Sequence, residues 1–405
     1  MRGTTRRPRA RSPSRSGDED AQRSRLAAGW HSPLPFRNTS RLRMRGGGGL
    51  LRSKSNAGLA LPRHLALLDG WRALSIILVL AGHLLPLGPS AWRLNAPVAA
   101  TGMVIFFTLS GFLITRFLIE DGNVRRFLVR RLFRIVPLAW LGMLLAFVVA
   151  GGASASEVVG NLLFIANLPP ASLIPPGAHF WSLCLEVQFY LAIALLLAMG
   201  RRGALLLIPL GCIAVTLARI YWLQPMSIVT WFRIDEILAG ATLALICDGR
   251  LGERLRKFVA TPKLFLIFPL LLASADLRTG FLPYLRPYLS ALVVGTSLFN
   301  APEWIRELCH RRVVSYVAQT SYALYVFHGI FANSWLGSGD TLVKYLKRPL
   351  LIAFTIGCAH LSTFHYERRW ISLGRRLTAR RPLGFPNDEG AFRTAALQNP
   401  ASGSN

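Results

Sequence analysis

The sequence predicts an all-α fold, a polytopic bundle of about ten transmembrane helices with both termini in the cytoplasm. Three observations support this prediction. Of the 405 residues, 52% are hydrophobic and only 16% are charged, and the mean hydropathy is +0.39. Apolar runs of the length that crosses a bilayer, roughly 17 to 25 residues, recur along most of the chain. Lysine and arginine gather in alternate connecting segments, as they do in cytoplasmic loops.

The predicted spans begin near residue 69 and end near residue 365. Backbone polar groups in lipid must be satisfied within their own segment, so each apolar run should form a helix. The spans are placed at residues 69–88, 101–119, 133–150, 180–199, 203–222, 229–247, 261–276, 281–300, 314–333 and 347–365. We therefore expect a multi-pass protein of the cell inner (plasma) membrane, in contact with membrane lipid.

The basic residues of the connecting segments indicate the orientation of the spans. The predicted cytoplasmic loops contain Arg125, Arg126, Arg130, Arg131, Arg201, Arg202, Arg250, Arg254, Arg256, Lys257, Arg306, Arg311 and Arg312. The predicted outer loops hold little beyond Arg93, Arg278 and Lys344. Residues 151–179 contain no lysine or arginine, which fits an outer loop with an interfacial or re-entrant piece.

Composition divides the chain into three parts. Residues 1–64 are rich in Arg, Ser, Pro and Gly, and their apolar content is too low to offset the entropy of ordering, so we expect a disordered basic tail. Residues 65–370 form the predicted transmembrane domain, and residues 371–405 form a basic cytoplasmic tail. Translation from Met44 is an open alternative, which would shorten the first tail.

The formal net charge of +28 does not by itself indicate nucleic-acid binding. The basic residues lie in the tails and in alternate loops, a distribution typical of topology signals, so we expect no nucleic-acid partner. The five cysteines are scattered and include no CxxC pair. Neither a disulfide framework nor a metal site is expected.

Two ionisable residues lie on one face of the first predicted span. Arg72 and His83 are eleven residues apart, about three helical turns, which separates them by about 16 Å along the axis. Arg72 would lie near the cytoplasmic mouth, where a snorkelling arginine is structurally ordinary. His83 would lie in the outer half, where an ionisable side chain is costly and indicates a functional site. A neutral imidazole can accept and return a proton near neutral pH, which suits general-base catalysis.

Three more ionisable residues are expected at a similar depth. Glu186 should lie about 9 Å below the outer surface, and Asp235 and His328 should lie in the same outer third. We expect Glu186 to orient His83. Each of these side chains has the alternative of a purely structural interhelical hydrogen bond.

The cytoplasmic side carries a concentration of guanidinium groups in the segment "RRFLVRRLFRIVPL". Topology signalling accounts for part of it, yet Arg130, Arg131 and Arg134 have spacings that can share a helix face. Planar guanidinium donors suit phosphates, so a cytosolic cosubstrate with phosphate groups is a candidate ligand. Ser110 and Gly111, within "FFTLSGFLIT", are small residues that permit close approach of a helix or a ligand.

Six blocks occur together in the order "LDGWRALSIILVLAGH", "FFTLSGFLIT", "RRLFRIVPL", "FWSLCLEVQFY", "SYALYVFH" and "YERRW". In this order they resemble the acyltransferase 3 family, integral membrane O-acyltransferases that modify sugars and related acceptors. The resemblance covers roughly residues 65 to 375. It implies transfer of an acyl group, usually acetyl from acetyl-CoA, to a hydroxyl of a carbohydrate, a lipid-linked glycan or a glycosylated metabolite. Acyl-CoA would be a cosubstrate, and no permanently bound cofactor is implied.

The resemblance implies roles for Arg72, His83, Glu186 and the arginines at 130, 131 and 134, and the position of the other polar and aromatic residues adds further candidates. His83 and Glu186 are the catalytic candidates, and the candidates for binding acyl-CoA are Arg72, Arg130, Arg131, Arg134 and Ser110. The candidates for contact with the acceptor are Asp235, His328, Trp181 and Tyr190. His83 would deprotonate the acceptor hydroxyl for direct attack on the thioester, and an acyl-histidine intermediate is the open variant. A transporter or flippase of a glycan or acyl precursor is the alternative function, although the sequence lacks the internal symmetry typical of transporters.

Overall fold

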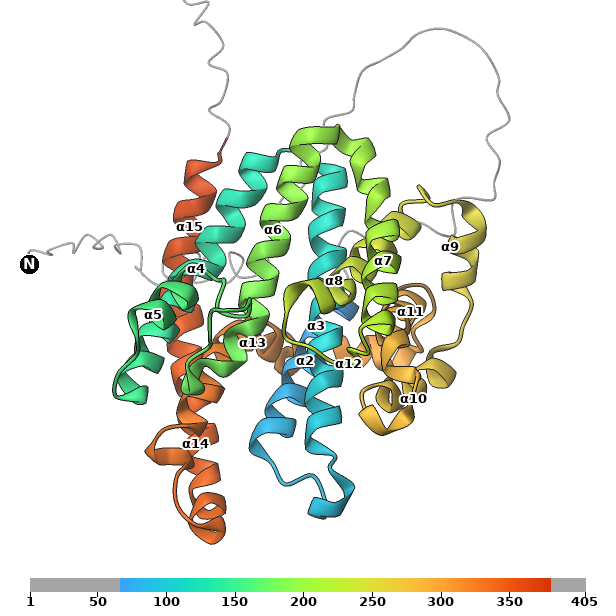
Figure 1. The fold of residues 1–405 in the computed structure, drawn as a ribbon. Helices are drawn as coiled ribbons and strands as arrows, with labels where there is room; N and C mark the ends of the chain where they lie inside the picture. The colour runs from blue at the N-terminus through green and yellow to red at the C-terminus, as the bar shows by residue number, and fades with distance from the viewer. Residues whose placement is uncertain (1–65, 380–405) are drawn as a thin grey trace, which may run out of the picture. The chain divides into compact units, whose positions relative to one another are not determined.

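The protein is represented by a computed structural model, which describes residues 66–379. Within that range the chain is helical and contains no strand (Figure 1). The predicted disordered tail, the alternative start at Met44 and the part of the predicted C-terminal tail beyond residue 379 lie outside the described residues.

Each predicted span coincides with one helix. These helices are α2 (Ala66–Leu84), α3 (Asn95–Glu120), α4 (Val124–Ala150), α6 (Trp181–Gly200), α7 (Ile208–Tyr221), α8 (Asp235–Cys247), α10 (Leu264–Ser274), α11 (Leu282–Asn300), α13 (Arg312–Ala332) and α14 (Thr341–Leu361). Four shorter helices lie between or after them: α5 (Ala155–Leu162), α9 (Glu253–Ala260), α12 (Glu303–His310) and α15 (Arg368–Leu377). A 3₁₀ turn, Pro175–Phe180, leads into α6, and a π-helical turn, Ser362–Glu367, joins α14 to α15.

The structure does not confirm the predicted number of about ten spans. Among the described residues, five helical segments are long and apolar enough to cross a membrane, and the count rises to six if α9 and α10, bent by 89°, are one span. α8 has 13 residues and α10 has 11, so they extend only about 20 Å and about 17 Å. The hydrocarbon core is about 30 Å thick. The hydropathy of these two segments predicted helix but could not show how late each α-helix begins.

The two ends of the bundle are named by their predicted sides. α2 runs toward the end that carries the loop before α3 and the start of α14, and we call this the predicted outer end (bottom of Figure 1). The opposite end carries the turn between α3 and α4, and we call it the predicted cytoplasmic end. α13 runs in the same direction as α2, so both helices finish at the predicted outer end.

α3 is the central helix, because 83% of its apolar window is buried inside the protein. Glycines allow its close contacts with α2 and α8. A Cβ on Gly102 would meet the carbonyl of Ser75, and a Cβ on Gly111 would collide with the carbonyl of Ile237. This agrees with the expectation that Gly111 permits close approach, and the partner is a helix.

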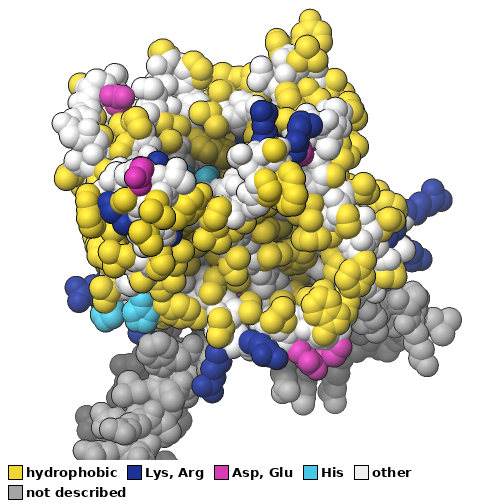
Figure 2. All heavy atoms as spheres, turned by 90° about the horizontal axis from the view of Figure 1, so that it is seen from below, with side chains coloured by type: hydrophobic (Ala, Val, Ile, Leu, Met, Phe, Trp, Pro, Cys, Tyr) yellow, Lys and Arg dark blue, Asp and Glu magenta, His cyan; other side chains and the backbone are white. Residues whose placement is uncertain are grey.

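The outward faces of the helices are apolar. Large hydrophobic side chains are exposed on α4, α6, α7 and α10, among them Val148, Leu195, Leu217 and Phe265. In the view from the predicted outer end, hydrophobic side chains cover most of the visible face (Figure 2). An apolar exterior of this extent is typical of a surface that faces lipid.

The predicted C-terminal tail begins inside α15. Residues 371–377 are helical, and α15 packs against α4, since a Cβ on Gly374 would contact the side chain of Phe133. The start of the predicted tail therefore belongs to the helical bundle.

Candidate active site

His83 and His328 form the centre of the candidate site. His83 lies in the last turn of α2 and His328 in the last third of α13, and the packing of these two helices brings the rings together. Nδ1 of His83 lies 3.1 Å from Nε2 of His328. The ring centroids are 5.1 Å apart with an angle of 22° between the planes.

The surrounding hydrogen bonds define the tautomers of the two rings. Nδ1 of His328 lies 2.6 Å from the carbonyl oxygen of Tyr325. A carbonyl only accepts, so Nδ1 of His328 must carry a proton. In a neutral ring its Nε2 then has the lone pair and accepts from Nδ1–H of His83. Nε2 of neutral His83 is therefore the nitrogen with a lone pair available to take a proton.

A third imidazole, from His179, lies against the pair. Its ring centroid is 4.8 Å from that of His328, and its Nε2 donates to the carbonyl of Val326 at 3.1 Å. The ring packs on Gly329, where a Cβ would collide with it. The sequence reasoning missed His179; its signal was a histidine directly before the "FWSLCLEVQFY" block.

The site opens at the predicted outer end. His83 is exposed, His179 is half-buried and His328 is buried. The space-filling view of this end shows a hollow with a histidine side chain inside it (Figure 2). A base in this position can meet a substrate that arrives from the predicted outer side.

Glu186 has partners other than His83. The hydroxyls of Ser110 and Tyr190 both donate to Oε1 of Glu186, each at 2.5 Å. Within the described chain the only side-chain hydrogen bond of His83 is to His328. The expected orientation of His83 by Glu186 is therefore wrong, because a second histidine occupies the hydrogen-bonding position at Nδ1.

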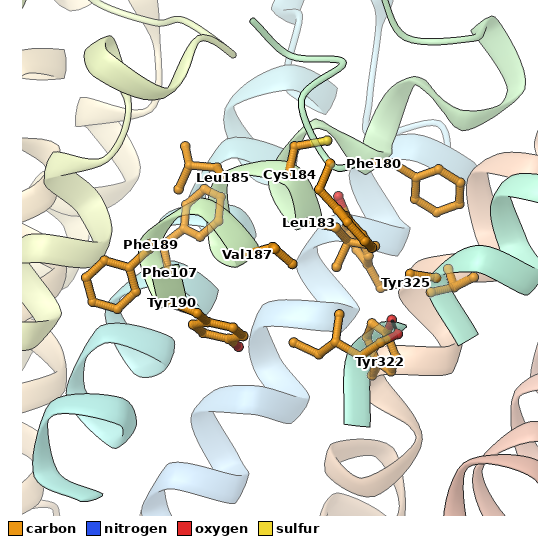
Figure 3. Close-up of a cluster of buried hydrophobic side chains, with 14 of the residues drawn as sticks. Phe107, Phe180, Leu183, Cys184, Leu185, Val187, Phe189, Tyr190, Tyr322 and Tyr325 are labelled. Carbon is orange, nitrogen blue, oxygen red and sulfur yellow. Dashed lines mark hydrogen bonds between the residues drawn. The ribbon is translucent and has the colours of Figure 1, made fainter. Parts of the chain in front are cut away.

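The region around Glu186 is a buried aromatic core. Tyr190 of α6 and Tyr325 of α13 belong to one hydrophobic cluster (Figure 3). The hydroxyl of Tyr325 donates to the carbonyl of His179 and also lies 2.6 Å from the hydroxyl of Ser182. These contacts hold the start of α6 against α13.

Three arginines lie close together toward the predicted cytoplasmic end. Arg72, Arg131 and Arg134 are within electrostatic range of one another, and Glu186 lies within range of Arg72 and Arg131. Arg72 donates a long hydrogen bond of 3.4 Å to Ser321 of α13. Within residues 66–379 the side chains of Arg131 and Arg134 form no hydrogen bond or ion pair. Their donors are thus free to bind an anion.

Arg130 is separated from this group. Its Nε donates to the hydroxyl of Thr378 at the end of α15, at 2.9 Å, and its charged neighbours are Arg126, Asp121 and Arg375. The shared face expected for the three arginines of α4 therefore holds for Arg131 and Arg134 only.

Glu367 is a second acidic residue near the arginines that the sequence reasoning missed. It is buried in the π-helical turn, accepts a 3.0 Å hydrogen bond from Thr363, and lies within electrostatic range of Arg134 and Arg72. The "YERRW" block contained it, but only the fold brings that block next to α4 and α2.

Asp235 belongs to a different buried network. It pairs with Arg219 of α7 at 2.5 Å, and the neighbouring Glu236 pairs with Arg286 of α11 at 2.8 Å. All four side chains are fully buried. No contact joins Asp235 to the histidines in the part of the chain that the structure describes, so its pairing is interhelical and separate from the histidine cluster.

Trp181 links this network to the core. Arg233, which pairs with Glu236 at 3.2 Å, has its guanidinium 5.3 Å from the ring of Trp181, and Phe107 meets the ring edge-to-face at 5.6 Å. Trp181 is half-buried, at the start of α6 near the predicted outer end.

Residues 65–364 match an acyltransferase domain, the one that defines the acyltransferase 3 family. The chain belongs to this family. The match includes the histidine cluster and the arginines of α2 and α4, and it agrees with the resemblance of the six blocks. No solved structure matches the chain.

Curated relatives share parts of the sequence. "Nodulation protein 10" of Rhizobium leguminosarum bv. viciae is 26% identical over 200 residues, which are 38% of this chain and 54% of that protein. "Putative peptidoglycan O-acetyltransferase YrhL" of Bacillus subtilis (strain 168) is 26% identical over 313 residues, 66% of this chain and 48% of that protein. A "Putative O-acetyltransferase" of Staphylococcus aureus (strain COL) is 23% identical over 346 residues, 72% of this chain and 55% of that protein. The chain thus spans about half the length of these relatives.

Proposed function

We propose that the protein is a membrane O-acyltransferase of the inner (plasma) membrane. It moves an acyl group to a hydroxyl of a carbohydrate, a lipid-linked glycan or a glycosylated metabolite. The favoured acyl group is acetyl, and its donor is acetyl-CoA. The observation that carries the proposal is the pairing of an exposed histidine with a buried one, His83 with His328, inside a bundle of the acyltransferase 3 family. The O-acetyltransferase names of two relatives support the choice of acetyl.

His83 acts as the general base in this proposal. Its Nε2 takes the proton of the acceptor hydroxyl as the hydroxyl oxygen attacks the thioester carbonyl. The carbon–sulfur bond breaks, the coenzyme A thiolate leaves, and the proton held by His83 passes to the sulfur. An ester and free coenzyme A are formed, and His83 is neutral again. A covalent acyl-histidine would use the same nitrogen as the nucleophile.

The donor enters from the predicted cytoplasmic end. Arg72, Arg131 and Arg134 bind phosphate groups of acyl-CoA, since guanidinium forks suit phosphate oxygens. Glu186, held by Ser110 and Tyr190, balances part of their charge when no donor is bound. Ser110 and Tyr190 therefore act on the donor through Glu186. Trp181, near the predicted outer end, is the candidate for stacking against a sugar of the acceptor.

The decisive experiment follows labelled acetyl from acetyl-CoA into the glycan, lipid and small-molecule fractions of membranes. Wild-type protein should label one fraction, and that fraction identifies the class of acceptor. His83→Ala should reduce labelling by about 100-fold or more, because general-base catalysis contributes about that factor. Folded wild-type protein that labels no fraction, or a His83→Ala variant that labels equally well, would overturn the proposal and favour transport.

A second experiment tests the arginines. Arg131→Gln and Arg134→Gln should each raise the KM for acetyl-CoA about tenfold or more and leave kcat nearly unchanged, since a charge-assisted hydrogen bond contributes about 1.5–3 kcal/mol. Comparison with acetyl-dephospho-CoA, which lacks the 3′-phosphate, shows which arginine meets that group. A variant that has lost this contact should no longer distinguish the two donors. Arg125→Gln, an exposed change on the same helix, is the control.

A further inference from the structure

A small cavity lies between α2, α3 and α13. Its volume is about 10 Å³, which holds one group of about the size of a water molecule or a methyl. Its lining consists of Ser75, Ile76 and Val79 from α2, Met103 and Phe106 from α3, and Ser321 and Tyr325 from α13.

The cavity lies on the path between the arginines and the histidines. Ser321, which lines it, accepts the hydrogen bond from Arg72. Val79, which also lines it, is four residues before His83, about 6 Å along the helix axis. On α13, Tyr325 lines the cavity while its carbonyl accepts from His328. A ligand that reaches from Arg72 to His83 along these helices passes the cavity.

The accessible lining of the cavity is entirely apolar, although two serines and a tyrosine contribute to it. The hydroxyl of Ser75 donates to the carbonyl of Arg72, and that of Ser321 donates to the carbonyl of Ala318. The hydroxyl of Tyr325 is engaged with His179 and Ser182. The amides of a pantetheine arm would lack partners here, and burying an unpaired amide is costly. A hydrocarbon group meets no such cost.

We propose that this cavity receives the hydrocarbon end of the donor's acyl group while the thioester carbonyl lies beside His83, and that Met103 and Phe106 limit the acyl chain to a short one. The inference rests on the proposed function. Phe106 closes one wall, because its ring stacks on that of Tyr325 with centroids 6.3 Å apart and an angle of 7°. Met103 is 6% exposed, so its side chain fills interior space that a longer chain would need.

The test measures transfer from acetyl-CoA, butanoyl-CoA and hexanoyl-CoA by the full chain in membranes. Wild-type protein should prefer acetyl. Met103→Ala should raise the ratio of butanoyl to acetyl transfer about tenfold or more, since a pocket that accepts an additional methylene changes selectivity by about that factor. Val79→Leu, which fills the cavity, should lower acetyl transfer. Phe106→Leu is a second variant that enlarges the cavity, and it replaces Met103→Ala in the test if Met103→Ala does not accumulate.

Met143→Ala is the matched control, because Met143 is fully buried in α4 and does not line the cavity. It should keep the wild-type ratio. The inference is overturned if Met103→Ala and Phe106→Leu keep the wild-type ratio, or if Met143→Ala shifts it equally. Wild-type protein that transfers no acyl group from any of the three donors would instead refute the proposed function, and the inference with it.

Discussion

At the scale of single residues, His83 has a neutral histidine as its hydrogen-bond partner, where a catalytic histidine usually has a carboxylate. The carbonyl of Tyr325 fixes the proton of His328 on Nδ1, and His328 in turn fixes the proton of His83 on Nδ1. This series of hydrogen bonds contains no negatively charged group. It therefore orients His83 and selects its tautomer without strongly stabilising the imidazolium form. His328 is a positioning residue by this argument.

The positioning role predicts different results for two replacements of His328. The amide oxygen of His328→Gln can still accept from Nδ1–H of His83, whereas His328→Leu offers no acceptor. We expect kcat to fall about 100-fold or more in His328→Leu and clearly less in His328→Gln, because a misoriented base loses much of the catalytic factor. Steady-state kinetics with labelled acetyl-CoA checks both variants.

Separate measurement of kcat and KM distinguishes this positioning role from a structural one. The KM for acetyl-CoA should stay near the wild-type value in both variants, since the arginines lie at the other end of the site. Equal losses in His328→Gln and His328→Leu, or a loss explained by a smaller amount of folded protein, would contradict the positioning role.

Part of this site could be predicted from the sequence at the residue scale. The spacing of Arg72 and His83 placed them on one face of a helix, and the depth of His328 was read from its span. The contact between His83 and His328 could not be predicted, because they are 245 positions apart and many residues share one depth. For the same reason Glu186 was assigned to His83, although hydroxyls from α3 and α6 hold it elsewhere.

At the scale of helices, glycines determine how closely α3 approaches its neighbours. Gly111 contacts α8, and the adjacent Ser110 donates to Glu186 of α6, so two neighbouring residues of α3 meet two different helices. Without a hydrophobic force between helices in lipid, such close packing supplies much of the association energy. The "SGFL" sequence thus connects helix packing with the position of Glu186.

Gly111→Ala tests this packing. The added Cβ would collide with the carbonyl of Ile237, a backbone atom that cannot move alone, so we expect a loss of about 3 kcal/mol and a lower Tm in detergent. Gly357→Ala is the matched control, because it lies inside α14, in the second-last turn, and nothing lies within 4 Å of its added Cβ. That change should raise stability slightly, by up to about 1 kcal/mol, through better helix propensity. Similar Tm values for the two variants would refute the packing argument.

The helices themselves were easier to predict than their lengths. Every predicted span contains a helix, because long apolar runs have few other structures available in lipid. The late start of α8 follows from its charged residues. Asp235 and Glu236 begin the helix and pair with arginines of α7 and α11, and the residues before them form only a short 3₁₀ turn, Thr230–Phe232. Hydropathy averages over such a boundary and therefore overestimates the span.

At the scale of the whole molecule, the site is a line of groups that joins the two ends of the bundle. Arg131 and Arg134 lie toward one end, the cavity lies in the middle, and His83 is open at the other. This order suits a donor and an acceptor that arrive from opposite sides of the membrane. The chemistry then depends on orientation, which the distribution of arginine predicts and labelling can measure.

Single cysteines at the two ends test the orientation. Ser90→Cys lies in the loop after α2 and Arg125→Cys lies in the first turn of α4, and both positions are exposed. With the N-terminus in the cytoplasm, an impermeant maleimide should label Ser90→Cys in intact spheroplasts and Arg125→Cys only after lysis. The unsubstituted protein gives the background, which should be low because four of its five cysteines are buried. The reverse pattern would place His83 on the cytoplasmic side. The acceptor would then enter from the cytoplasm and the donor from the outer side.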